Sequence, residues 1–565
     1  MKKLGVLAAF MMVASMAFSS GILTNTNQSA QFIRMLSRNA SLGIDGVYYN
    51  PAGLIKLDDG WHFSVNSQTI WQTRSIDSKF PLLNDGYYEG DVFVPSFPTL
   101  FAAYKMDKWA LSFGFGPNAG GGTANFDRGL PSFEIPISKV VPALAPLTQI
   151  DPSLAVSGYD ADLTLNGSSM FLGFQIGATY EVSDMLSLSA GVRYMPAINK
   201  YTGSIRDIQL KVAGEYYDAP EWLTGAAGAV SGYASQASAG ADLLYNTASS
   251  MQPIIDGGGG VYTLAQLEGA GVIDATQRAQ IEGGLMQIGI PQEQINVMNM
   301  SQVQGTYNTA GDQYTQTAAV LTGTAQSLNG TASQLGDKEV ETKQTGAGFT
   351  PILGLNFSPN ENVNIAVRYE HKTYLTVENS TKVDDLGLFP DGEISRSDVP
   401  GILGIGFGYT DNDWFEVQFS YNYYFDKNVD WGGNIRDIAI WKDRDPSKIR
   451  AREIENNTFD VALGVQFNAT KKFSISAGAM YQKVGVADSY NSDFDYSPDS
   501  NLAIGGGIMW KLTDQLTLDA GFIDVLYKEA QVSYFDPDLN TNYNETYDKK
   551  SMSFALGLSY SLPFE

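Results

Sequence analysis

The feature that most constrains this chain is a two-residue alternation of large apolar with small or polar side chains. In residues 109–116, for example, Trp109, Leu111 and Phe113 alternate with alanine, serine and glycine. Successive side chains of a β-strand point to opposite faces, so this period indicates strands whose two faces meet different environments. The pattern recurs fourteen times, at 61–71, 98–106, 109–115, 170–180, 186–194, 349–357, 363–369, 403–409, 415–425, 459–467, 473–479, 502–512, 516–522 and 554–564.

The connections between these segments alternate between short turns and long polar loops. The short ones are 107–108, 181–185, 358–362, 411–413, 469–472 and 513–515. An even strand count with this asymmetry is typical of outer-membrane barrels. We therefore predict an all-β fold, a 14-stranded antiparallel transmembrane β-barrel over residues 60–565, with both chain ends on the periplasmic side. The alternative is a soluble all-β protein whose apolar faces form a core, and the consistent turn asymmetry favours the membrane.

The start of the chain predicts export. Lys2 and Lys3 precede an apolar run at 4–18, and Ser19 and Ser20 offer a cleavage site, so residues 1–20 are interpreted as a secretory signal peptide. The run is short for a membrane-spanning helix. Export and the strand pattern together predict the bacterial outer membrane.

Composition excludes some classes of function. The formal net charge of −25 argues against nucleic acid as a partner, and the absence of cysteine excludes disulfides and thiolate chemistry. The sequence combines 12% aromatic residues with 58 glycines, which suits a barrel with aromatic girdles and small residues on crowded walls.

Residues 21–59 lack the alternation and end in a bend. Pro51 fixes its own φ and holds Asn50 in an extended conformation, so Asn50, Pro51, Ala52 and Gly53 predict a sharp turn just ahead of the first strand. With both ends on the periplasmic side, the lumen is the space open to this segment. We predict that 21–59 form a hatch, or plug, inside the barrel.

A long segment at 204–345, rich in Gly, Ala, Ser, Thr and Gln, interrupts the strand pattern. Thr263 with Gln266, and Asp274 with Gln277, have the spacing of capping boxes, and apolar residues recur at helical spacing from Ile281. These signals predict a partly helical extracellular insertion in the third outer loop. For the two ends of the segment, a flexible low-complexity loop is the favoured interpretation.

The hatch, the Asn50–Gly53 motif, the fourteen strands and the aromatic last strand together resemble the FadL-like family of long-chain fatty-acid and aromatic-hydrocarbon outer-membrane transporters. The resemblance implies passive inward diffusion of hydrophobic molecules past the hatch and out through a lateral opening at a kinked third strand. Gly114, Gly116 and Pro117 end the third predicted strand and suit such a kink. We expect the Asn50–Gly53 motif to act as a gate beside it. The run 37–41, Ser-Arg-Asn-Ala-Ser, is bulkier and more polar than the family's small-residue run, which bears on the ligand and not on the fold.

Several apolar side chains fall in the hatch or on inward-facing strand positions. They either line a ligand path or pack the barrel against the hatch: Phe32, Met35, Leu36, Ile352, Ile402, Met480, Met509 and Ile523. Arg193 and Arg368 also face inward and are candidate contacts for a carboxylate head group. An ion network with Glu370, Glu416 or Asp519 is the favoured alternative for these two arginines.

The sequence offers no catalytic constellation. It has two histidines and lacks the local motifs of metal-dependent or triad hydrolases, so we expect no cofactor, no metal and no enzymatic activity. The predicted function is passive uptake of hydrophobic small molecules by a monomer that contacts its ligand and outer-membrane lipid. The alternatives are a diffusion porin for polar solutes, and a surface adhesin or lipid hydrolase on a barrel scaffold.

Overall fold

The computed structural model describes residues 24–411, 414–429, 454–486, 491, 493, 496, 497 and 499–564. The predicted signal peptide (1–20), residues 21–23 of the predicted hatch and part of the predicted turn 411–413 lie outside the described residues. The chain divides into two compact units: one holds most of the sheet, and the other contains 140–160 and 207–336. Each unit is considered by itself.

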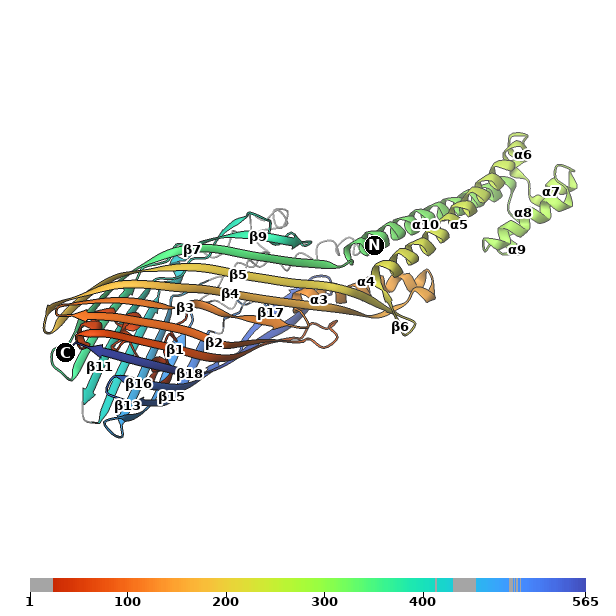
Figure 1. Ribbon diagram of the computed structural model, residues 1–565. Helices are drawn as coiled ribbons and strands as arrows, with labels where there is room; N and C mark the ends of the chain where they lie inside the picture. The colour runs from red at the N-terminus through yellow and green to blue at the C-terminus, as the bar shows by residue number, and fades with distance from the viewer. Residues whose placement is uncertain are drawn as a thin grey trace. The chain divides into compact units, whose positions relative to one another are not determined.

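The sheet closes on itself, because β1 pairs antiparallel with both β2 and β18. The fourteen predicted strands are confirmed, and they follow one another around the barrel (Figure 1). They are β1 (Gly60–Ser78), β2 (Tyr87–Met106), β3 (Trp109–Phe126), β4 (Val156–Ser183), β5 (Leu186–Val212), β7 (Lys338–Phe357), β8 (Val363–Glu370), β11 (Ile402–Asp411), β12 (Phe415–Tyr424), β13 (Thr458–Asn468), β14 (Phe473–Lys483), β15 (Ser500–Lys511), β16 (Leu516–Tyr527) and β18 (Thr541–Pro563).

Four shorter strands lie in the long connections. β9 (Thr376–Asp384) continues the pairing of β8 along β7, and β10 (Ile394–Arg396) pairs with β9. β6 (Glu215–Asp218) pairs with the end of β5, and β17 (Ala530–Asp536) pairs with β18. The sequence did not predict these strands.

The two faces of the barrel differ as the alternation predicts. On β3, Leu111 is 55% exposed, whereas Ala110 is fully buried. Aromatic side chains gather on the outer face beside the short turns: the ring of Trp61 lies 4.6 Å from that of Tyr104, and that of Trp109 lies 4.7 Å from that of Tyr180. An outward apolar band bounded by such rings is the arrangement by which barrels sit in a bilayer. Across the described ranges, the helices are all too short or too polar to cross a bilayer.

The segment before β1 folds into α1 (Ala30–Met35), α2 (Gly46–Tyr49) and the 3₁₀ helix η2 (Pro51–Lys56). Ser29 caps α1 by accepting a hydrogen bond from the amide of Phe32, and Leu36 ends it at a φ of 58°. The three helices are buried against inward-facing strand residues, which are often glycine. A Cβ atom added at Gly505 would lie 2.6 Å from the carbonyl oxygen of Ile33, so the wall leaves room for the hatch only because side chains are missing there.

The second unit is helical. Its helices are α4 (Val140–Leu144), η3 (Ala145–Gln149), η4 (Pro152–Leu154), α5 (Ala219–Ser250), α6 (Gln252–Asp256), η5 (Gly259–Val261), α7 (Leu264–Gly269), α8 (Ala275–Gln287), α9 (Gln292–Ile295) and α10 (Met300–Gln334). A further helix, α3 (Pro131–Ser138), belongs to the barrel unit. The predicted capping boxes at Thr263 and Asp274 are confirmed as the starts of α7 and α8.

The expectation of flexible ends for the 204–345 segment is wrong. α5 and α10 are long helices that run side by side, and both occupy stretches interpreted as low-complexity loop (Figure 1). Their contact faces are built from small residues: Ala227, Ala234, Ala241 and Ala248 recur at seven-residue spacing on α5 and are buried. Alanine lets two helices approach closely and has the highest helix propensity, so a composition that resembles a linker here forms a tight helical pair.

Candidate functional site

The Asn50–Gly53 motif anchors the hatch to the barrel wall. Asn50 caps η2 by accepting from the amide of Gly53, and its Nδ2 donates to Asn356 Oδ1 of β7 at 2.7 Å. The carbonyl oxygens of Pro51 and Ala52 accept hydrogen bonds from Thr179 of β4 and Ser187 of β5. Gly53 is required because a Cβ atom there would collide with the carbonyl oxygen of Ser41.

The hatch residues that bond β3 near Pro117 belong to a different segment from the Asn50–Gly53 motif. Gln28 donates to the carbonyl of Pro117 at 2.8 Å, and the Asn25 amide donates to the carbonyl of Asn118 at 2.8 Å. The Asn25 side chain donates to the carbonyls of Pro117 and Gly120. Sequence reasoning missed Asn25 and Gln28, since neither belongs to a recognisable motif and only the fold brings them to β3.

β3 does break its regular geometry where Gly114, Gly116 and Pro117 predict a kink. Its pairing with β4 shifts register after Pro117 and again after Gly120, which has a φ of 67°. On its other side β3 faces β2, where Asp91 pairs with Asn125 and Leu100 pairs with Phe115. Between these two pairs the described residues of β2 and β3 form no ladder pair. We call this stretch, Val92–Thr99 facing Gly116–Ala124, the β2–β3 seam.

Prolines contribute to the seam from both strands. Pro95 and Pro98 lie on β2 and Pro117 on β3, and none of them can donate a backbone hydrogen bond. β2 stays attached to β1 in this region, where Thr69 donates to the carbonyl of Pro95 and Ser67 bonds Ser96. The barrel wall is therefore continuous along β1–β2 and along β3–β4, and weak between β2 and β3.

A cavity of about 330 Å³ lies inside the barrel against this seam. Val92, Val94 and Gly122 line it from the seam, and Phe32, Met480 and Ile523 line it from the hatch and the opposite wall. These last three belong to the predicted ligand path, so the structure brings them together. The other five predicted path residues do not line the cavity. Met35 and Leu36 are fully buried, Ile352 and Ile402 flank Glu370 as its strand partners, and Met509 is half-buried on β15.

Arg193 and Arg368 have partners inside the barrel. Arg193 forms an ion pair with Glu370 at 2.7 Å, and the Nε atom of Arg368 lies 3.5 Å from the same carboxylate. Both guanidinium groups also stack on the ring of Tyr48, at 5.1 and 4.9 Å. This is the ion network that the sequence offered as the alternative to head-group contacts, and it fixes α2 to the wall.

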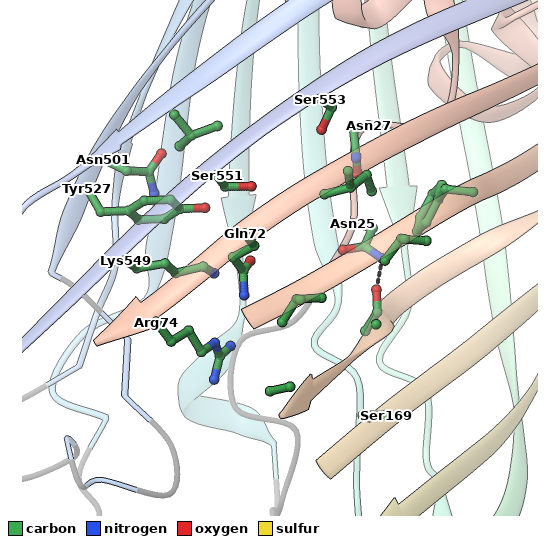
Figure 2. A pocket seen from close by; sticks show the side chains of 18 of the residues that line it. Asn25, Asn27, Gln72, Arg74, Ser169, Asn501, Tyr527, Lys549, Ser551 and Ser553 are labelled. Atoms are coloured by element: carbon green, nitrogen blue, oxygen red, sulfur yellow. Dashed lines mark hydrogen bonds between the residues drawn. The ribbon is translucent and has the colours of Figure 1, made fainter. Parts of the chain in front are cut away.

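Two other cations face the cavity. Arg74 of β1 and Lys549 of β18 are direct cross-strand partners and both line the cavity (Figure 2). Arg74 lies 5.6 Å from the ring centre of Tyr496, and Lys549 lies 4.7 Å from that of Tyr527. The buried Nε atom of Arg74 has no hydrogen-bond partner among the described residues.

Arg74 and Lys549 carry like charges and lie directly opposite each other on β1 and β18. Sequence reasoning missed this opposition because the pairing joins the first strand to the last. The opposition of Arg74 and Lys549 could have been predicted from the inward-facing positions of both residues together with the pairing of the first and last strands that closes the barrel.

The histidines have structural surroundings. His62 is buried, and its ring nitrogens contact Ser561 Oγ and the carbonyl of Asp58. His371 lies beside Tyr369. Among the residues with described positions, no group of three His, Cys, Asp or Glu side chains is placed to hold a metal ion.

Comparison with known proteins agrees with this architecture. Residues 289–562 match the model of a family described as Outer membrane protein transport protein (OMPP1/FadL/TodX). The fold is similar to that of a Pseudomonas aeruginosa FadL homologue, with a TM-score of 0.51 and 13% identity over 96% of this chain and 99% of that one. The toluene transporters TodX of P. putida (TM-score 0.46, 11% identity, 93% and 95% covered) and TbuX of Ralstonia pickettii (0.45, 12%, 96% and 99%) also match. No curated protein sequence matches the chain.

The closed barrel and its lumen hatch define a plugged outer-membrane β-barrel. The family match confirms the predicted resemblance to the FadL-like transport proteins. The protein is located in the bacterial outer membrane.

Proposed function

We propose that this protein takes up hydrophobic small molecules passively, through the cavity and then sideways through the β2–β3 seam into the membrane. The observation that carries the proposal is the position of the cavity, whose lining includes residues of both unpaired strand segments. A volume of about 330 Å³ lies in the range of small-molecule sites.

The lateral route follows from where the hydrogen bonds are. A path along the barrel axis would have to break the buried bonds that hold the hatch, such as Arg34 with Asp519 and Asn50 with Asn356. A path through the seam has no strand ladder to break. Transfer of an apolar solute into the hydrocarbon core lowers its free energy, so this exit requires no energy source. In this scheme the Asn50–Gly53 motif is a fixed anchor, and the moving part lies at the seam.

The cavity further suggests which hydrophobic molecules fit. Phe32, Met480 and Ile523 give it an apolar side, and Arg74 and Lys549 give it a cationic end. An amphipathic anion, such as a long-chain fatty acid, would bury its chain on the apolar side and place its carboxylate at the cationic end, where the buried Nε atom of Arg74 has no hydrogen-bond partner among the described residues. Arg74 and Lys549 therefore replace Arg193 and Arg368 in the proposed head-group site. A neutral aromatic hydrocarbon would use the apolar side only.

Binding to the purified protein tests the proposal. A fluorescent long-chain fatty acid should bind, and Arg74→Gln should weaken its binding by about tenfold or more, since a hydrogen bond to a charged group contributes ~1.5–3 kcal/mol. Binding of the methyl ester should change little in the same variant. Lys382→Gln, which alters an exposed ion pair with Glu341, is the control.

Two outcomes would count against this assignment. Equal loss for acid and ester would show that Arg74 supports the fold and not the head group. Absence of binding by either ligand to the folded wild-type protein, together with steady ion conductance in planar bilayers, would favour a polar-solute porin. We further propose that the chain acts as a monomer in contact with outer-membrane lipid, and that it is not an enzyme.

A further inference from the structure

Three residues close the seam beside the cavity: Val92 and Val94 of β2, and Gly122 of β3. A Cβ atom added at Gly122 would overlap a methyl group of Val92 and lie 3.1 Å from Cγ2 of Val94. The two valines therefore lie directly against the glycine backbone. We call this contact the valine gate.

The rest of the seam is sealed differently. The backbone carbonyls of Pro117, Asn118 and Gly120 on β3 accept hydrogen bonds from Asn25 and Gln28 of the hatch. Gln28 also accepts from Thr99 Oγ1 of β2 through its own carbonyl, so the hatch bridges the two strands there. The three atoms nearest to a Cβ added at Gly122 all belong to the two valines. Hydrogen bonds from the hatch close one part of the seam, and apolar contact closes the seam at Gly122.

We propose that the valine gate is the moving part of the lateral exit and sets the girth of the molecules that pass. This inference rests on the proposed function. Backbone pairing holds Val92 and Val94 to Gln72 and Ile70 of β1, so the β2 backbone stays in place while the side chains move. Side-chain rotation is far faster than strand separation and breaks no hydrogen bond. Glycine at 122 leaves an opening once the valine methyl groups turn away, whereas any larger residue would fill it.

Closure can be imposed chemically. A Cβ atom added at Gly122 would lie 3.8 Å from the Cβ of Val92. The mean distance between the two Cβ atoms of a disulfide is also about 3.8 Å. The chain has no cysteine, so Val92→Cys with Gly122→Cys introduces two thiols with only each other as partners. The matched control is Ala103→Cys with Ser112→Cys, which are direct partners on the same two strands within the intact ladder.

The test measures two quantities with a fluorescent fatty acid: its binding to purified protein, and its transfer into the bilayer of proteoliposomes. We expect the oxidised gate pair to lose transfer and to regain it on reduction, when the two forms are compared at equal amounts of bound ligand, while the control pair transfers equally in both states. Normal transfer by the gate pair, with the cross-link confirmed by mass spectrometry, would overturn the gate. Loss of binding in the wild-type protein would instead refute the proposed function.

A second variant keeps the inference testable if the thiols do not pair. Val92→Ala with Val94→Ala widens the gate without adding any group. We expect transfer of a bulky, branched tracer to rise several-fold more than that of a slender chain of equal hydrophobicity. An equal change for both tracers, or none, would show that the valines do not set the girth.

Discussion

The Arg34–Asp519 ion pair allows the attachment of the hatch to be measured. Arg34 Nε lies 2.7 Å from Asp519 Oδ1, and the two side chains are only 4% and 3% exposed. Arg34 also donates to Gln466 and Ser476, and Gln31 donates to the second carboxylate oxygen. This cluster joins α1 to strands β13, β14 and β16. The informative perturbation is Asp519→Ala, which removes the only acid of the cluster.

The magnitude follows from leaving a buried cation without its partner. Removing one member of a buried ion pair costs about 3–5 kcal/mol, because the remaining charge stays desolvated. The barrel ladders are untouched, so this cost falls on docking of the hatch. Since 1.36 kcal/mol is a factor of ten, opening of the hatch should become roughly 150- to 5,000-fold more frequent. Arg34→Leu combined with Asp519→Leu leaves no unpaired charge and should recover most of the loss.

Hydrogen exchange of residues 24–56, followed by mass spectrometry on detergent-solubilised protein, measures that opening. Heat-modifiable mobility on a gel verifies that the barrel remains closed. Glu341→Ala is the control, because its pair with Lys382 is 39% and 74% exposed and such pairs contribute about 0–1 kcal/mol. If the hatch of folded Asp519→Ala protein exchanges no faster than that of the wild type, the argument from the buried pair is wrong.

Three further predictions concern the membrane face, the helical unit and pH. Phe419→Arg, at a 41% exposed outward position, should cost about 2–4 kcal/mol at mid-membrane in reversible unfolding from lipid vesicles, and an unchanged unfolding curve would contradict the assigned face. Replacing 219–336 by a short Gly-Ser linker should leave heat-modifiable folding intact, because loop length costs little entropy; loss of folding would show that the unit is part of the barrel. Burial raises the pKa of Asp426, outside the strands, to about 6, so the native state binds a proton there more readily than the unfolded chain. Local stability should therefore fall as pH rises from about 4 to 6, and Asp426→Asn should remove this dependence in hydrogen exchange.

The barrel could be predicted from the sequence because its signal is local and repeated. An apolar side chain at every second position records which face meets lipid, and both the strand count and the turn asymmetry follow from it. Long helices at 219–250 and 300–334 escaped prediction because their buried faces are rich in alanine, glycine and threonine, which give little hydrophobic contrast with the exposed faces. What stabilises them is close packing against each other, which composition does not show.

The candidate site was harder to predict because it depends on register between distant strands. Met480 and Ile523 were identified by strand parity and Phe32 by its place in the hatch, and the three line the same cavity. The opposition of Arg74 and Lys549 requires knowing that the first and last strands pair, and with which offset. The contact of Gln28 with the kink depends on the path of an irregular segment, for which no periodic pattern exists.

An opening in the wall of a membrane barrel leaves backbone N–H and C=O groups without strand partners, and this cost arises whatever the width of the opening. Backbone groups that lose their strand partner within the hydrocarbon region each cost several kcal/mol unless something else bonds them. Here Pro95, Pro98 and Pro117 remove donors from the seam, and Asn25 and Gln28 bond the carbonyls that the kink leaves over. The hatch segment is thus part of the wall as well as a plug. It follows that release of the hatch by Asp519→Ala should also weaken the seam. Solute leakage through the lumen and through the seam should therefore appear together.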